Sequence, residues 1–236
     1  MIGTKKIQHF IRSLFLASNA TEESIPQLHP LTLKFINHHS HLEKGYLEFY
    51  TTTFTRQTQV SHVVAIIFYS IFSFLDIIFV PEYASTFIFI RLGIVVPVLV
   101  LTLFFSFQKY FINYLQTILF FSIFIAGSGI IAMIAIGGPE INSTYYAGLI
   151  LVFIFTYTFV GIKFKWAMLV TWLLVLAYEI VSIYHGLNFE VFVSNNFFFI
   201  STLLFSMIAG YSIEFYRRSE FYIFHLLEIE KNIPQR

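Results

Sequence analysis

Residues 69–97 read YSIFSFLDIIFVPEYASTFIFIRLGIVVP, which is two apolar runs with one charge each, separated by the short segment PEYAS. Proline, glutamate and serine within 81–85 are typical of a turn, so both apolar runs end there. Followed outward, each run extends to about 20 mostly apolar residues, the length that an α-helix needs to cross a bilayer. The stretch therefore predicts a hairpin of two membrane-spanning helices, with Asp76 on one arm and Arg91 on the other.

The composition of the whole chain extends this prediction from two helices to the entire protein. Hydrophobic residues make up 57% of the 236 residues and charged residues only 11%, whereas soluble domains carry about 25% charged residues. We therefore expect an integral membrane protein whose main surrounding partner is the lipid bilayer. The net charge of +1 gives no indication of a nucleic-acid partner, and the absence of cysteine excludes disulfides and thiolate metal sites.

The predicted fold is an all-α integral membrane bundle of six transmembrane helices. A cytoplasmic helical segment precedes the bundle, and the last membrane helix continues beyond it. The predicted organisation is an N-terminal region at 1–56, a membrane domain at 57–214 and an exit helix at 215–236. The six predicted spans are 60–80, 86–107, 113–136, 145–162, 164–185 and 193–214.

The distribution of lysine and arginine predicts the orientation of this bundle. If the N-terminus is cytoplasmic, 13 of the 14 basic residues fall on the inner side, and the remaining one, Arg91, lies inside a span. Short cytoplasmic loops of membrane proteins carry an excess of lysine and arginine. We therefore expect a multi-pass protein of the cell membrane with both termini in the cytoplasm.

Three charged side chains fall inside predicted spans, at similar depth near the outer ends: Asp76, Arg91 and Glu179. A charge that faces hydrocarbon is costly, so we expect all three to face the bundle interior and find partners. Asp76 and Arg91 should pair across the hairpin, and Glu179 would complete a triad. This network either joins helices structurally or lines a pocket for an unknown small ligand on the outer side. The expected hydrogen-bonding neighbours are Tyr145, Tyr146, Tyr178 and His185.

The last predicted span has no helix breaker at its cytoplasmic end, so we expect the helix to continue through Arg217 and Arg218. Apolar residues beyond that point recur at intervals of three and four, as in a heptad seam. The seam predicts a homodimer formed through span 6 and its continuation; a helix lying on the lipid surface is the alternative. The principal seam residues are Phe215, Tyr222, Leu226 and Ile229.

Several segments resemble the six-span membrane domain of bacterial class III adenylate and guanylate cyclases. They are LEKGYLEFY at 42–50, the hairpin at 69–97, YYAGLILVFIFTYTFVGIKFKWA at 145–167, YEI at 178–180 and RRSEFYIFHLLEIEKN at 217–232. The resemblance covers residues 42–232. It implies a receptor-like or regulatory membrane domain whose exit helix begins a signalling stalk, which in that family leads to a dimeric cytoplasmic cyclase domain.

These observations favour a membrane sensor or regulatory domain that acts on a cyclase-type output but lacks a catalytic domain of its own. A small multi-pass transporter or channel subunit is the alternative, and an intramembrane enzyme acting on lipid is a third possibility. Transport requires polar groups through the full depth of the membrane, whereas the predicted charges gather on one side. We expect no enzyme activity from the chain itself, no metal site and no cofactor, because the sequence has no phosphate-binding loop, nucleophile elbow or paired metal carboxylates.

Overall fold

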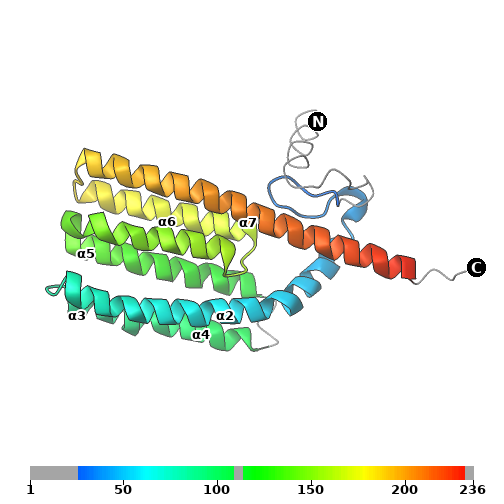
Figure 1. Ribbon diagram of the computed structural model, residues 1–236, viewed down its shortest axis with the longest axis horizontal. Helices are drawn as coiled ribbons and strands as arrows, with labels where there is room; N and C mark the ends of the chain where they lie inside the picture. The colour runs from blue at the N-terminus through cyan, green and yellow to red at the C-terminus, as the bar shows by residue number, and fades with distance from the viewer. Residues whose placement is uncertain (1–25, 109–113, 232–236) are drawn as a thin grey trace, which may run out of the picture. The chain divides into compact units, whose positions relative to one another are not determined.

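Helices account for nearly all the regular structure in the computed structural model, which describes residues 26–108 and 114–231 (Figure 1). The chain divides into two compact units, Met1–Thr53 with Gly210–Arg236, and Phe54–Ala209. We call them the terminal unit and the bundle unit; α2 and α7 contribute residues to both. The elements are η2 (Asn37–His39), α2 (Leu42–Phe79), α3 (Ala84–Ile88), η3 (Phe89–Val95), α4 (Val96–Ser106), α5 (Leu115–Thr158), α6 (Phe164–Tyr184) and α7 (Phe189–Lys231).

Five of the helical segments in the described part of the chain are long and apolar enough to cross a membrane: Leu42–Phe79, Ala84–Ser106, Leu115–Thr158, Phe164–Tyr184 and Phe189–Lys231. Many of their large apolar side chains point outward, among them Phe74 on α2 and Phe205 on α7. Lipid is as apolar as these side chains, so a membrane bundle has no reason to bury them. The prediction of an all-helical membrane protein is confirmed at this level.

The helix that carries Arg91 contains a widened turn. Residues Phe89–Val95 form a π-helical segment between α3 and α4, and the Val96 amide donates to the Arg91 carbonyl five residues back. Pro97 follows directly; it has no N–H to offer, and its ring would crowd the carbonyl of Gly93. A π turn removes this conflict. The helix is therefore widened at the turn that contains Arg91.

Helix α5 folds back on itself at Gly138, whose backbone (φ 72°, ψ −160°) is not helical. Figure 1 shows the two limbs of α5 beside α6. The limbs pack closely, because a methyl group placed on Gly148 would lie 3.2 Å from Ile130 of the other limb. A methyl group on Gly127 would overlap Leu174 of α6. Small residues therefore allow close helix packing here.

The terminal unit has a short irregular segment before α2. Leu28 and Phe35 form an isolated antiparallel bridge, and Leu33 between them has a left-handed backbone (φ 54°). The side chains of Leu28, Leu33 and Phe35 are buried. Phe35 also lies in ring contact with Phe221 of α7. Apolar burial thus holds this segment against the part of α7 that belongs to the same unit.

Candidate functional site

A buried ion pair joins α2 to η3 in the bundle unit, as the sequence predicted. Arg91 Nε lies 2.6 Å from Asp76 Oδ2, and Arg91 Nη2 lies 3.2 Å from Asp76 Oδ1. Only 1% of Asp76 and 5% of Arg91 is exposed. Planar guanidinium and carboxylate groups suit this two-bond geometry. Both charges are therefore compensated at a place where neither has access to water.

Aromatic side chains complete the surroundings of the pair. The Tyr145 hydroxyl of α5 donates to Asp76 Oδ1 at 2.5 Å, so three helical segments meet at one carboxylate. The Arg91 guanidinium lies 5.4 Å from the ring centroid of Tyr69 and 5.6 Å from that of Phe72. Cation–π contacts of this kind stabilise a desolvated charge. Tyr69 and Asp76 are seven residues apart on α2, two helical turns, and therefore share a face.

A second polar network lies between α5, α6 and α7 in the same unit. Tyr178 donates to Asn142 Oδ1 at 2.7 Å, and Asn195 Nδ2 donates to both Asn142 Oδ1 (3.1 Å) and the Tyr178 hydroxyl (2.8 Å). Asn142 Nδ2 reaches Ser182 Oγ at 3.4 Å. All four side chains are buried. Hydrogen bonds of this kind connect helices in a membrane, where the alternative is an unsatisfied polar group.

The predicted triad is wrong, because Glu179 does not join Asp76 and Arg91. Glu179 forms a side-chain hydrogen bond with Asn196 of α7, and its other oxygen, Oε1, is buried without a partner. Adjacent residues on a helix point about 100° apart, so Tyr178 can face the network while Glu179 faces Asn196.

Two other predicted neighbours also lie outside the ion pair. Tyr146 packs edge-on against Phe199, with ring centroids 5.7 Å apart. His185, directly after the last residue of α6, lies in ring contact with Tyr184. Of the seven predicted network residues, Asp76, Arg91 and Tyr145 come together, and Tyr178 belongs to the second network.

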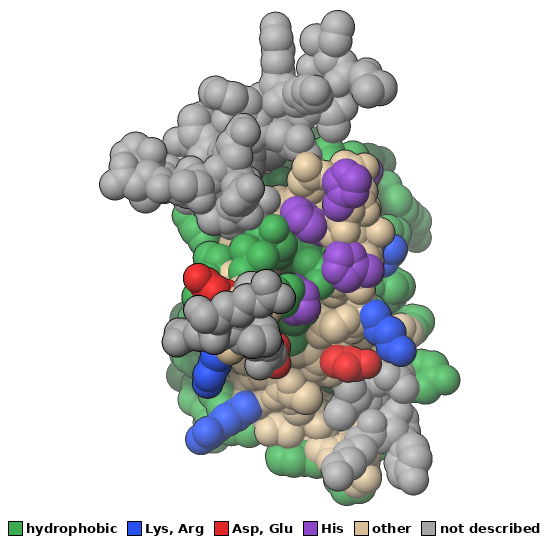
Figure 2. Space-filling model, turned by 90° about the vertical axis from the view of Figure 1, so that its right-hand side faces the viewer, with side chains coloured by type: hydrophobic (Ala, Val, Ile, Leu, Met, Phe, Trp, Pro, Cys, Tyr) green, Lys and Arg blue, Asp and Glu red, His purple; other side chains and the backbone are tan. Residues whose placement is uncertain are grey.

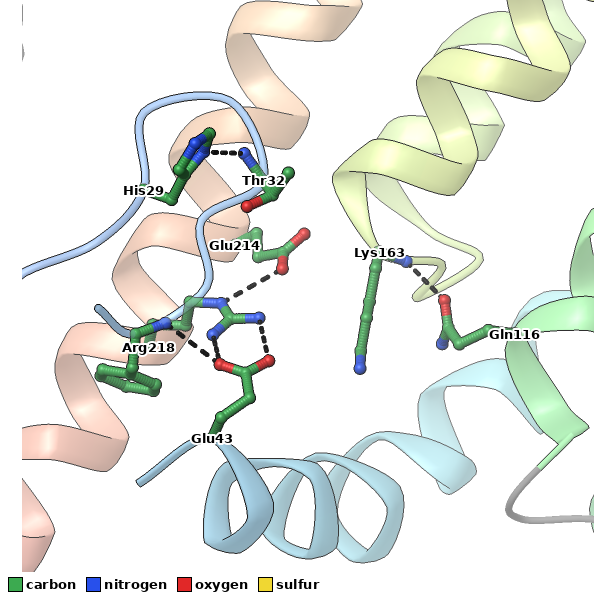
Figure 3. A network of polar contacts seen from close by, with 8 residues as sticks. His29, Thr32, Glu43, Gln116, Lys163, Glu214 and Arg218 are labelled. Atoms are coloured by element: carbon green, nitrogen blue, oxygen red, sulfur yellow. Dashed lines mark hydrogen bonds and ion pairs between the residues drawn. The ribbon is translucent and has the colours of Figure 1, made fainter. Parts of the chain in front are cut away.

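The terminal unit contains a buried charge cluster that the sequence did not indicate. Arg218 of α7 is 1% exposed; its Nη1 lies 2.7 Å from Glu43 Oε2, and its Nε lies 3.2 Å from Glu214 Oε1. Figure 3 shows both carboxylates directed at the guanidinium. The guanidinium also lies 4.2 Å from the Tyr46 ring centroid. Two carboxylates and one ring face thus offset the buried charge of Arg218.

Aromatic residues surround this charge cluster. Phe221 of α7 contacts the rings of Phe35, Tyr46 and Phe49. The ring of Tyr222 is tilted against that of His39, with 4.7 Å between the ring centroids. The N-terminal segment and α7 therefore share one small core of buried charges and aromatic rings, which we call the Arg218 cluster.

The predicted dimer seam is divided by this arrangement. Phe215 and Tyr222 are buried, and Tyr222 lies against the chain's own His39. Leu226 and Ile229 are exposed, Ile229 by 49%. Four residues that share a helix face thus have two different environments, and only Leu226 and Ile229 are open to another molecule.

Sequence reasoning missed Glu43, Glu214 and Arg218 as partners and Asn142 and Asn195 as a pair. Glu43 and Arg218 are 175 residues apart, and no periodic pattern relates them. The one available signal was the i, i+4 spacing of Glu214 and Arg218 on a predicted helix. Within the described ranges, no group of three or more His, Cys, Asp or Glu side chains is placed to hold a metal ion.

The arrangement in both units is that of buried, compensated charges that fix helices to one another. Asp76 connects two helical segments through a charge and a third through a hydroxyl, while Arg218 connects α7 to the N-terminal segment. In comparison with known proteins, the sequence model of the MASE8 family matches residues 74–228, more than half of the chain. No curated protein and no solved structure matches.

Proposed function

The chain belongs to the MASE8 family of membrane-associated sensory domains, and we propose that it is a receptor-like regulator that passes a conformational signal along α7. The observation that carries this proposal is the continuity of α7, a single helix from Phe189 to Lys231. It begins among the apolar helices of the bundle unit and ends in the terminal unit. A helix of this kind transmits a shift or a rotation from one unit to the next.

In this proposal the chain crosses the membrane six times. Five helices are apolar and long enough, and α5 folds back at Gly138 into two limbs that each cross once. The distribution of lysine and arginine supports a cell-membrane protein with both termini in the cytoplasm. The C-terminal ends of α2 and α6, near Asp76 and His185, then lie on the outer side. The chain reversal of α5 at Gly138 lies on the same side.

The sensing element is the ion pair of Asp76 and Arg91 with Tyr145. A small polar or charged ligand on the outer side that competes for either partner would alter the contacts among α2, η3 and α5. Arg91 lies in a π turn, a local irregularity that is frequent at functional sites. A ligand shifts such an equilibrium only by its difference in affinity for the two states.

The output is a cyclase-type signalling domain reached through α7, as the resemblance to class III cyclases implies. We propose that the chain regulates this output and does not itself catalyse a reaction. We further propose a homodimer in which the exposed residues Leu226 and Ile229 of two chains meet. Such a seam is short and would be stabilised by a dimeric output domain.

A fusion experiment tests this proposal. A class III cyclase catalytic domain is joined after Lys231, with zero, one, two, three or seven helix-forming residues inserted at the junction. Each residue rotates the helix by about 100°, so one to three residues change the phase, while seven residues restore it to within about 20°. We expect cyclase activity to fall severalfold with one to three insertions and to return with seven.

The control and the refuting outcome come from point variants of the same fusion. Arg91→Gln should change cyclase activity because it removes the compensated pair, whereas Glu220→Gln alters an exposed residue of α7 and should leave activity unchanged. Activity that is equal for all insertions and for Arg91→Gln would show that α7 is only a membrane anchor.

A further inference from the structure

Two histidine rings in the segment before α2 accept hydrogen bonds from backbone amides at their Nδ1 atoms. His29 Nδ1 accepts from the backbone amides of Leu31 (3.3 Å) and Thr32 (3.2 Å), and Figure 3 shows His29 directed at Thr32. His39 Nδ1 accepts from the Gln27 amide at 3.1 Å. A backbone N–H is only a donor, so each Nδ1 must carry a lone pair. These hydrogen bonds therefore require both imidazoles to be neutral.

The second nitrogen of His39 connects the same segment to α7. With Nδ1 unprotonated, the ring proton of neutral His39 sits on Nε2, which lies 3.2 Å from the Tyr222 hydroxyl and donates to its oxygen. The His39 and Tyr222 rings also contact each other, with centroids 4.7 Å apart. One neutral imidazole thus joins Gln27 of the segment to Tyr222 of α7.

Protonation would reverse the role of each Nδ1. An imidazolium donates from both nitrogens, so His29 and His39 would each present an N–H to a backbone N–H, and three amides would lose their acceptor. Burial lowers the pKa of His39, and the neighbouring His41 and His38 lower it further, because they would repel a second positive charge. From α7 the hydroxyl of Tyr222 faces His39, and the carboxylate of Glu43 accepts hydrogen bonds from Arg218 and from the Phe35 amide.

We propose that residues 26–41 form a pH-sensitive latch on α7. It is closed when Nδ1 of His29 and of His39 accepts these backbone hydrogen bonds, and it opens when protonation of His39 turns its Nδ1 into a donor. Figure 2 shows histidine side chains gathered on one face of the molecule, where water can deliver protons. Opening would separate Tyr222 from His39 and uncover part of the Arg218 cluster. The latch itself is a property of the terminal unit; only its effect on an output domain rests on the proposed function.

The direction of the pH effect follows from proton binding. The closed latch binds fewer protons than the open one, so its stability is complete above the ordinary histidine pKa of about 6.5 and falls as the pH drops below it. The physiological variable sensed would be the acidity on the side of the membrane where residues 26–41 lie.

Distance measurement between spin labels on the full chain tests the latch directly. The protein has no cysteine, so labels can be placed at single introduced cysteines. One pair, Lys34→Cys with Glu228→Cys, reports the segment against α7; a second pair, Lys44→Cys with Glu228→Cys, reports α2 against α7. All three positions are exposed. In nanodiscs, the first pair should shift from one short distance at pH 7.5 to mostly longer distances at pH 5, while the second pair stays constant.

Matched variants separate the two histidines from general acid effects. Asparagine places an oxygen near the position of Nδ1 and cannot be protonated, so His29→Asn with His39→Asn should remove most of the acid-induced shift. His38→Asn with His41→Asn should retain the shift, because no hydrogen bond in the described structure depends on those rings. If the distance between the labels at positions 34 and 228 is unchanged at pH 5 in the protein that keeps all its histidines, the latch is overturned. This measurement does not depend on the folding of any histidine variant. An undiminished shift in the His29/His39 variant overturns it equally.

Discussion

Removing one partner of the Asp76–Arg91 pair should cost far more stability than removing both. Asp76→Asn leaves the guanidinium in a site that is 5% exposed, with only aromatic rings to offset its charge. Breaking a buried ion pair in this way costs about 3–5 kcal/mol, and Arg91→Gln should cost a similar amount. The double variant buries two neutral amides that can hydrogen-bond to each other. The double variant should therefore lose about 3 kcal/mol less unfolding free energy than the sum of the losses in the two single variants.

This coupling energy is large enough to distinguish an ion pair from an ordinary hydrogen bond between membrane helices, for which the average is about 0.6 kcal/mol. Titration of purified protein with a denaturing detergent, followed by tryptophan fluorescence, gives the unfolding free energies. Tyr145→Phe serves as the matched control, because it removes a hydrogen bond to the same carboxylate and no charge. We expect it to cost no more than about 1.7 kcal/mol. A coupling energy within about 0.5 kcal/mol of zero would refute the reasoning.

Three further predictions concern topology, the fold of α5 and the dimer. A membrane-impermeant thiol reagent should label a cysteine at Glu190 in intact cells and miss one at Lys44; the reverse pattern would invert the proposed orientation. Gly138→Ala should lower the unfolding free energy by about 1–3 kcal/mol, because its backbone region is nearly exclusive to glycine; an unchanged value would mean that the chain reversal does not depend on this residue. A cysteine at the exposed Ile229 should form disulfide-linked dimers in membranes, and one at the buried Tyr222 should not; equal cross-linking would contradict the divided seam.

Much of the fold was predictable because membrane helices have a strong local signal. Length and apolarity indicated an apolar stretch in each of the five long helical segments that the structure describes, although six spans were predicted. The turn at 81–85 set the hairpin of Asp76 and Arg91. The boundaries were less predictable. The segment 137–144 was expected as a loop, but only Gly138 departs from helical geometry. Helical hydrogen bonding continues through polar residues such as Asn142 because their side chains find partners across the bundle.

The candidate site was predictable only where sequence neighbours become spatial neighbours. Asp76 and Arg91 meet across a tight turn, so the pair follows from local structure. The position of Glu179 depends on the rotation of α6 about its axis, which an almost uniformly apolar helix does not encode. Glu43, one of the two carboxylate partners of Arg218, lies 175 residues away in the sequence. The burial of Arg218 depends on tertiary packing between α2 and α7, and no local sequence pattern indicates this packing.

The distance in sequence between Glu43 and Arg218 also has a consequence for biosynthesis. Glu43 leaves the ribosome 175 residues before Arg218, and at about 5–20 residues per second this interval lasts roughly 9–35 s. During that time the helices from α3 to α6 are made, while the aromatic rings and the carboxylate that will surround Arg218 have no counterpart. The terminal unit can therefore assemble only after the last helix of the bundle has been translated. Its completion therefore marks a chain in which α2 through α7 have all been synthesised.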